Sequence, residues 1–345
     1  MNLLKKLSLR STNVIRKKPC NFNKKDEHLF KNALTMYLPR VFPVEIKNIY
    51  IPPCGRLFNG ISFNLLQFNL NIEFIGLLKS YLKSFFFLTK IRKKTNFHNI
   101  LYVTNSNSAN FFHWFLDVLP KIEFIIQNKD SILKSNLKII IPNGHNNIHT
   151  KMSLAAFDLD FYYQKKNEII VSDKSILLPD IAPTGNYRKN FVLKLNQRLK
   201  NHWIAKNIII QSKKRIYISR KNAKKRRLKN EHEIIPILKK YEFLILDFDK
   251  INFEEQLKYT LDSELLISVH GSGLTHMLWM KQKSKILEIR AKDNINDNCY
   301  FVLASDLGHD YFYLNADKNN LKISDHLSDI EINKDQFLSL LLKML

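Results

Sequence analysis

The chain has 345 residues, and 55 Lys and Arg against 31 Asp and Glu give it a formal net charge of +24 at pH 7. Its hydrophobic content of 45% and charged content of 25% are ordinary for a globular protein and exclude a disordered or fibrous chain. At about 150 residues per domain, the length predicts two domains. The positive charge favours anionic partners: nucleic acid, acidic lipid headgroups or phosphate-bearing substrates.

The cysteines and the N-terminal residues bear on the compartment. Cys20, Cys54 and Cys299 are widely spaced and odd in number, which predicts no disulfide framework. Residues 1–18 are basic but lack the apolar run of a signal peptide. The most apolar stretch, 61–88, is interrupted by Asn, Glu and Lys, whereas a membrane span needs about 20 mostly apolar residues. We therefore expect a cytoplasmic protein without a membrane span.

In chain order, the first half mixes strands with helices. Apolar runs predict strands at residues 44–51, 99–103, 137–141, 168–171 and 175–178. Helical periodicity predicts helices at residues 108–127, 150–157 and 190–206. The last of these looks like a connector, so we divide the chain into an N-terminal α/β domain at 1–200 and a C-terminal domain at 201–345.

After this connector, strands and helices alternate regularly. Strands are predicted at residues 215–219, 243–247, 264–269 and 285–289, with helices between them at 231–240, 253–261 and 274–280. Asn230 and Glu233 have the spacing of a capping box. A final helix at 334–345, with Asn333 as N-cap, is expected to pack back on the N-terminal domain. Such alternation is typical of a parallel, doubly wound sheet.

The sharpest motif is SVHGSGLTHMLWM, residues 268–280. An apolar strand ends at His270, and Gly271 and Gly273 open the turn into a helix. In open α/β sheets, ligands bind at the carboxyl ends of strands, where glycines admit a phosphate to the backbone N–H groups of a helix N-terminus. Two hydroxyl side chains add donors: Ser272 and Thr275. The alternative is that the glycines only make a tight turn.

A second candidate follows the strand at 215–219. Ser219 and Arg220 lie at the same edge of a parallel sheet as the glycine turn, and a guanidinium there suits a bidentate pair with a diphosphate. The alternative for residues 221–227 is a solvated basic loop or a nucleic-acid patch. For Lys224 and Lys225 we favour the solvated loop.

The third motif lies on the helix predicted at 108–127. His113 and Asp117 are four residues apart and so share a helix face, with Asn110 one turn earlier. A carboxylate beside an imidazole fixes its tautomer and raises its basicity, which suits a general base. The alternative is a core helix on which His113 only bonds to a neighbour.

Several patterns imitate metal sites. The acidic pairs at 158–160 and 247–249 have DxD spacing, and His145 and His149 are spaced like zinc ligands but have no third ligand nearby. We interpret all of them as structural. The expectation is that the protein needs no metal and no cofactor.

As a set, these motifs resemble glycosyltransferase family 61, which includes bacterial capsule and lipopolysaccharide enzymes. The matching segments are NFFHWFLDVLPK (110–121), RIYISR with RRLKNE (215–220 and 226–231) and FEEQ to ILEIR (253–290). Members commonly have Ala where this chain has Ser272 and Asn where it has His276. Ser272 leaves the backbone donors intact, whereas His276 puts any side-chain contact at that position in doubt.

The resemblance implies a GT-B architecture, with two Rossmann-like domains facing a cleft, and an inverting transfer from a nucleotide sugar. It implies that the second domain binds the donor through Ser219, Arg220, His270, Gly271, Ser272, Gly273 and Thr275, with Glu288 on the ribose hydroxyls. The first domain would supply His113 and Asp117 as catalytic residues, with Asn110 and Trp114 on the acceptor side. His113 is the expected base, and Asp117 is the alternative.

We therefore expect a metal-independent hexosyl- or pentosyl-transferring enzyme that acts on a growing surface polysaccharide or a lipid-linked glycan. An anionic membrane surface is a further expected partner, contacted from the cytoplasm by basic residues: Lys5, Lys6, Arg16, Lys17, Lys18 and those at 90–94. The other classes are a nucleic-acid-binding protein and a non-catalytic relative. Nucleic-acid binding predicts aromatic side chains interleaved with basic ones, but here they gather in apolar runs such as 111–115, so no nucleic-acid partner is expected.

Overall fold

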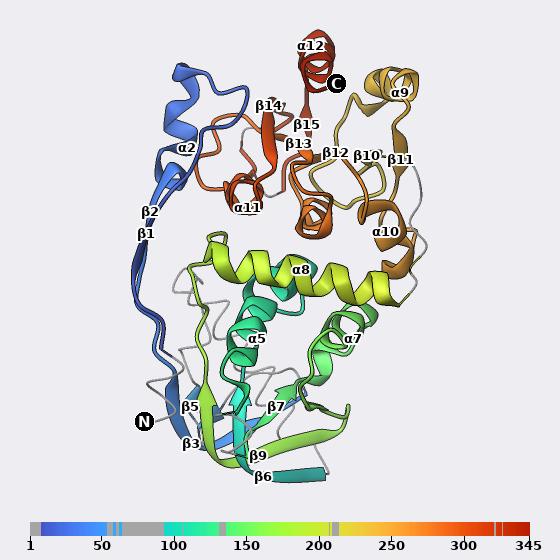
Figure 1. Ribbon diagram of the computed structural model, residues 1–345. Coiled ribbons are helices and arrows are strands. Elements are labelled where there is room, and N and C mark those ends of the chain that lie inside the picture. Colours follow the sequence, from blue (N-terminus) through green and yellow to red (C-terminus); the bar gives the residue numbers. More distant parts are fainter. Residues whose placement is uncertain are drawn as a thin grey trace. The chain divides into compact units, whose positions relative to one another are not determined.

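The computed structural model describes residues 8–53, 58–59, 62–63, 93–105, 107–130, 136–206, 208, 214–320, 322–325 and 327–345. Several residues discussed above lie outside these ranges: Lys5, Lys6, Cys54, most of 61–88 and residues 90–92. The chain divides into two compact units, which are described one at a time (Figure 1). Unit 1 comprises Met1–Thr12 and Leu38–Thr184, and unit 2 comprises Asn13–Tyr37 and Gly185–Leu345.

Helix α8 (Lys189–Ala205) lies in unit 2, whereas the predicted boundary at residue 200 cuts through it. Asn196 and Lys200 of this helix donate hydrogen bonds of 2.5 and 2.9 Å to the carbonyls of Leu278 and Met280. These partners are about 80 residues away in sequence. Local sequence patterns do not reveal contacts between residues so far apart, which is why the predicted domain boundary differs from the observed one.

Segment Asn13–Tyr37 also belongs to unit 2, although it lies within the predicted N-terminal domain. Nε of Arg16 lies 3.1 Å from Oδ1 of Asp306, and both side chains are almost inaccessible. Helix α2 (Glu27–Leu34) packs the ring of Phe30 edge-on against those of Phe301 and Tyr313, with centroids 5.1 and 4.8 Å apart. A buried ion pair and aromatic packing therefore fix this segment on unit 2.

Unit 1 is built on a mixed sheet of seven strands in the order β5-β4-β3-β9-β6-β7-β8. Their bounds are β3 (Val44–Ile51), β4 (Phe58–Asn59), β5 (Ser62–Phe63), β6 (Lys93–Tyr102), β7 (Lys138–Ile141), β8 (Phe161–Tyr163) and β9 (Glu168–Leu177). Strands β6 to β9 are parallel to one another, and β3 is antiparallel to β9. The two strands predicted at 168–171 and 175–178 are one strand, because Ser172 and Lys174 between them also pair with β3.

The sheet of unit 2 has the order β11-β10-β12-β13-β14-β15. Its strands are β10 (Arg215–Ile218), β11 (Leu244–Leu246), β12 (Leu265–Val269), β13 (Lys285–Ala291), β14 (Asp310–Lys318) and β15 (Ile330–Glu331). The first five in that order are parallel, and β15 is antiparallel to β14. The parallel sheet predicted for the second half is thus confirmed, although β14 and helix α11 (Cys299–Leu307) were not predicted.

Helices cover both faces of this sheet, with α9 (Glu231–Lys240) and α12 (Lys334–Met344) on one side and α10 (Phe253–Thr260) and α11 on the other (Figure 1). The fold is therefore a doubly wound α/β fold, compatible with a Rossmann-like glycosyltransferase. Helix α12 buries Phe337 and Leu341 in the core of unit 2. This corrects the expectation that it packs back on the N-terminal domain: its apolar face is already covered within its own unit. Among the described residues, no helix is both long and apolar enough to cross a bilayer.

Candidate functional site

The helix predicted at 108–127 contains a change of helix type at its centre. It consists of α4 (Phe111–His113), the π-helical turn η3 (Trp114–Val118) and α5 (Leu119–Ile126). Within η3, the N–H of Leu119 donates to the carbonyl of Trp114, five residues earlier. Single π turns inside helices occur frequently at functional sites.

His113, the last residue of α4, lies beside Asp117 of this turn, as predicted. Nδ1 of His113 is 2.7 Å from Oδ2 of Asp117, and the exposed fractions of the two side chains are 21% and 3%. Burial raises the pKa of Asp117, and the hydrogen bond from His113 opposes that rise. A carboxylate on Nδ1 holds the ring proton there and leaves Nε2 for a ligand. Of the two groups, His113 is the one that a substrate can reach more easily.

A polar network that the sequence analysis missed lies beside this pair. Nζ of Lys121, almost inaccessible, is 2.7 Å from Oδ1 of Asp180, and the amide of Asn105 donates to the same carboxylate at 3.2 Å. The charge of Asp180 contributes to the raised pKa of Asp117. The sequence holds one signal of this network, since Lys121 follows Asp117 by four residues.

The two residues assigned to the acceptor side have structural partners. The side chain of Asn110 caps α4 by accepting from the N–H of Phe112 at 2.9 Å. Trp114 is fully buried, and its indole N–H donates to Oγ of Ser153 at 2.9 Å. The structure thus contradicts the acceptor-side role of Trp114, because its indole lies in the core.

In unit 2, the carboxyl ends of β10 and β12 bring Arg220 and Gly271 together, as the sequence analysis expected. Nε and Nη2 of Arg220 donate to the carbonyls of Arg226 and Lys225 at 3.1 and 3.0 Å. Nη1 lies over Gly271, where an added Cβ would be only 2.6 Å away. Glycine is therefore required at this position so that the guanidinium can lie against the backbone turn.

The glycine turn leads into the 3₁₀ helix η5 (Ser272–Trp279). Gly273 packs closely on β10, since a Cβ there would meet Cγ2 of Ile218 at 3.2 Å. Ser272 is half-buried at the start of the helix, whereas Thr275 is fully buried. The hydroxyl of Thr275 is thus inaccessible to a phosphate, which contradicts its predicted role.

Two other predicted donor residues are bonded inside unit 2. Oγ of Ser219 donates to Glu231 at 3.0 Å. Glu288 is fully buried and accepts hydrogen bonds from Nδ1 of His270 and from the hydroxyl of Tyr311. The structure contradicts the ribose-binding role of Glu288, because both carboxylate oxygens are occupied within the fold.

Arg226 is a second cation at this edge that the sequence analysis did not single out. Its φ of +56° places a non-glycine residue in the left-handed region, and it directs its carbonyl to Nε of Arg220. Burial lowers the pKa of Arg220, and the charge of Arg226 lowers it further, partly offset by Asp249 and Asp329. An anion bound here would relieve the repulsion between two neighbouring guanidinium groups.

His276 and the acidic pairs with the spacing of metal ligands have partners within the fold. His276, fully buried, packs against the rings of Phe248 and Trp279, with centroids 4.6 and 4.7 Å apart. Asp158 and Asp160 each pair with a lysine, and Asp247 accepts from Asn222 at 2.6 Å. Across the described ranges, no three His, Cys, Asp or Glu side chains gather as a metal site requires.

Two buried histidines allow us to predict how the free energy of unfolding depends on pH. Burial lowers the pKa of His145 and of His309 to about 4, against an ordinary value of 6.5. The unfolded chain then binds protons more strongly than the folded one, so the free energy of unfolding falls as pH drops from 6.5 to 4. Each histidine contributes a fall of about 3 kcal/mol.

Urea denaturation at pH 7.5 and 4.5 measures this for His145→Gln against the unmodified protein, which cancels the contribution of the carboxyl groups. The variant should lose less stability on acidification. His98→Ala, which removes an exposed histidine, is the control. An equal acid sensitivity in His145→Gln and the unmodified protein would contradict the prediction.

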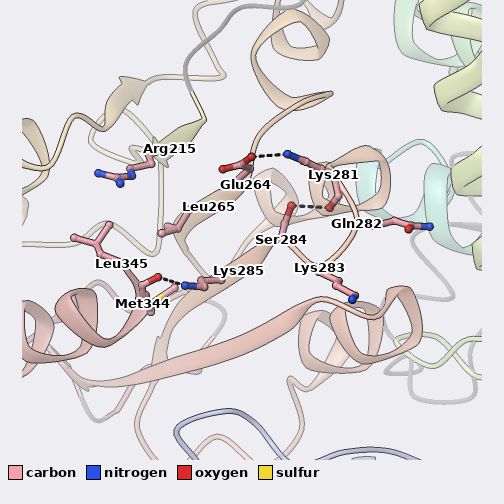
Figure 2. A pocket seen from close by; sticks show the side chains of 10 residues that line it. All are labelled: Arg215, Glu264, Leu265, Lys281, Gln282, Lys283, Ser284, Lys285, Met344 and Leu345. Atoms are coloured by element: carbon pink, nitrogen blue, oxygen red, sulfur yellow. Dashed lines mark hydrogen bonds and ion pairs between the residues drawn. The ribbon is translucent and has the colours of Figure 1, made fainter.

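A cavity of about 290 Å³ lies at the opposite, amino-terminal edge of this sheet. It is lined by the first residues of three strands, Arg215, Leu265 and Lys285, and by Lys281 and Glu264, which form an ion pair (Figure 2). Nζ of Lys285 is bonded to the carbonyl of Met344. Because ligands of such sheets bind at the carboxyl edge, this cavity is separate from the site at Arg220 and Gly271.

Comparison with known proteins agrees with these motifs. The glycosyltransferase 61 family model matches residues 111–287, slightly more than half of the chain. The EGF domain-specific O-linked N-acetylglucosamine transferase of Drosophila melanogaster is 37% identical over 99 residues, which are 27% of this chain and 18% of that protein. Its counterparts from Gallus gallus and Rattus norvegicus are 30% and 28% identical over 95 and 97 residues. The match spans less than a fifth of the length of these relatives.

These relatives correct the predicted location. Their names specify EGF domains, which are disulfide-rich modules of secreted proteins and not of the cytoplasm. The cytoplasmic location expected from the cysteine count and the N-terminal residues is therefore wrong. A low cysteine count does not define a reducing compartment, because a protein with large enough hydrophobic cores needs no disulfides to fold.

Proposed function

Because this chain belongs to the glycosyltransferase 61 family, we propose that it transfers a sugar from a nucleotide-sugar donor to an acceptor hydroxyl, with inversion at the anomeric carbon and in a GT-B arrangement. The observation that carries the proposal is the guanidinium of Arg220, held against the backbone turn at Gly271. Both lie at the edge of a parallel sheet where ligands of such folds bind.

The donor side stabilises the departing diphosphate. Two carbonyls fix the guanidinium of Arg220 before any ligand arrives, and the start of η5 follows Gly271 directly. A preorganised cation and helix-terminal N–H groups can meet the charge that develops on the leaving group, without reorganisation during the reaction. The neighbouring Arg226 adds a second positive charge.

The acceptor side supplies the base. Nε2 of His113 takes the proton from the acceptor hydroxyl as its oxygen attacks the anomeric carbon, and the bond from that carbon to the diphosphate breaks. The carboxylate of Asp117 stabilises the imidazolium that forms. The greater exposure of His113 supports its assignment as the base, with Asp117 as its positioning residue.

Two acceptor classes remain as proposals. The first is a glycan hydroxyl of a growing polysaccharide or lipid-linked chain. The second is a hydroxyl of an EGF domain with N-acetylglucosamine as the sugar, which the names of the relatives favour. Incubating the purified protein with labelled nucleotide sugars and either a glycan or a folded EGF domain separates them by which acceptor gains label.

The first test is a thermal-shift screen of nucleotide sugars. A donor that binds only the folded chain adds about 2.7 kcal/mol to the free energy of unfolding when its concentration is a hundred times its Kd. This stabilisation raises Tm. No shift with any nucleotide sugar, together with no labelled product, would overturn the proposed function.

We also propose that the transfer needs no divalent metal, since Arg220 and Arg226 supply positive charge at the donor edge. The rate should persist after exhaustive treatment with EDTA. Loss of activity that Mn²⁺ or Mg²⁺ restores would contradict this and direct attention to Asp247 and Asp249. The double variant Asp247→Asn, Asp249→Asn would then show whether those carboxylates hold the ion.

A further inference from the structure

A hydrogen-bonded chain crosses the sheet of unit 2 directly beside the donor edge. His270 follows β12, Glu288 lies on β13 and Tyr311 on β14, which are neighbouring strands. Nδ1 of His270 bonds to Oε1 of Glu288, and the hydroxyl of Tyr311 donates to Oε2 at 2.5 Å. Since a carboxylate only accepts, both neighbours must donate to it.

Burying the carboxylate of Glu288 lowers the free energy of unfolding, so its position points to a functional role. The side chain is fully buried, and a buried carboxylate without partners strongly destabilises a fold. Even a well-paired buried charge is often no more stable than an apolar residue of similar size. Leu287 and Ile289, its neighbours on β13, show that this strand fills its other face with apolar side chains.

Contacts further out hold this chain in place. The ring of Phe30 lies edge-on to that of Tyr311, with centroids 6.5 Å apart. The guanidinium of Arg290, buried beside the carboxylate, lies over the ring of Phe30 at 5.2 Å and donates to Asn298 at 2.8 Å. Segment Asn13–Tyr37 thus packs against Tyr311 through the ring of Phe30.

The imidazole at the end of the chain remains partly accessible. The side chain of His270 is 12% exposed, and the residue directly precedes Gly271, over which Arg220 lies. Its Nε2 is 3.9 Å from Oδ2 of Asp297, beyond hydrogen-bond distance, and its ring packs against that of Tyr300. Nδ1 is therefore engaged in the interior, whereas Asp297 does not take the hydrogen-bonding position of Nε2.

We propose that Glu288 and Tyr311 are positioning residues that fix the ring of His270, which the family resemblance already places at the donor, so that its Nε2 meets the leaving diphosphate. As the imidazolium, His270 donates Nε2–H to a phosphate oxygen beside Arg220. The proton on Nδ1 stays on the bond to Glu288 throughout. This inference rests on the proposed function and deepens it, because it says which buried residues orient one of the predicted donor-binding groups.

The test compares Glu288→Gln and Tyr311→Phe with Tyr313→Phe. Tyr313 lies on the same strand and donates to Asp26 rather than to Glu288, so its variant is a matched control. Nitrogen-15 NMR, with His270 assigned from a His270→Gln variant, reports whether one or both ring nitrogens carry a proton. Steady-state kinetics with the donor found in the screen reports kcat and KM separately.

We expect Glu288→Gln, whose amide cannot balance the imidazolium charge, to weaken the doubly protonated signal of His270 and to lower kcat by about 10- to 100-fold, the loss typical when the hydrogen-bonded partner of a metal-ligating histidine is removed. Tyr311→Phe should do the same to a smaller degree, and Tyr313→Phe should do neither. An active unmodified protein whose Glu288→Gln variant keeps its kcat and its ring-nitrogen signals would overturn the positioning role alone. An unmodified protein that binds no nucleotide sugar would instead overturn the proposed function.

Discussion

His113→Ala should lower kcat by about 10²- to 10⁴-fold while leaving donor affinity unchanged, because a positioned general base contributes that much to proton transfer. The imidazole is the more exposed member of the pair with Asp117, and the bond between them holds the ring proton on Nδ1. Asp117→Asn should lose less, since an amide oxygen still accepts from Nδ1 but no longer balances the imidazolium charge. Single-turnover rates and donor Kd values measure the two effects separately.

The control for this prediction is another histidine–aspartate pair of unit 1. Nδ1 of His98 lies 3.4 Å from Asp173, and both side chains are more than 70% exposed. His98→Ala should leave kcat unchanged. A larger loss in Asp117→Asn than in His113→Ala would transfer the role of base to Asp117, and near-normal rates in both would remove this helix from the chemistry.

Arg220→Ala should weaken donor binding by about 10- to 150-fold, the equivalent of about 1.5–3 kcal/mol for one charge-assisted hydrogen bond. Gly271→Ala should act in the same direction without removing any charge. An added Cβ would meet Nη1 at 2.6 Å and push the guanidinium from its place. Isothermal titration with the donor measures Kd for both variants.

Matched variants separate these effects from a general loss of charge or of fold. Lys224→Ala removes a charge from an exposed position on the same loop, and Gly144→Ala adds a Cβ that meets its neighbour at an ordinary 3.7 Å. Both should bind the donor normally. Unchanged affinity in Arg220→Ala and Gly271→Ala, with normal melting temperatures, would sink the donor-site assignment.

Much of the site was predictable because its parts are local in sequence. The spacing of His113 and Asp117 places them on one helix face whatever the rest of the chain does. The strand–helix alternation after residue 200 predicts a parallel sheet, and a parallel sheet brings the ends of β10 and β12 to one edge. That geometry alone was enough to expect Arg220 and Gly271 together.

The roles of Glu288, Thr275 and Trp114 could not be read in the same way. Each lies close in sequence to another predicted site residue, but burial decides what a polar or aromatic side chain does. Glu288 is buried because helices cover both faces of the sheet, so that every residue of β13 after the first is buried, and Tyr311, which bonds to it, belongs to a strand that was not predicted. Burial of this kind depends on neighbours that lie far away in the sequence.

The amino-acid sequence by itself determined the family of this protein, the order of its central strands and helices, and the residue types at the donor edge and on the π-helical turn. These follow from short-range periodicity and from motif spacing. The tertiary structure alone decided that Asn13–Tyr37 completes the C-terminal unit, that the guanidinium of Arg220 lies against Gly271, and that His270 is bonded to a buried carboxylate. Contacts between distant segments decide which polar groups remain exposed, and those contacts form only when the chain has folded.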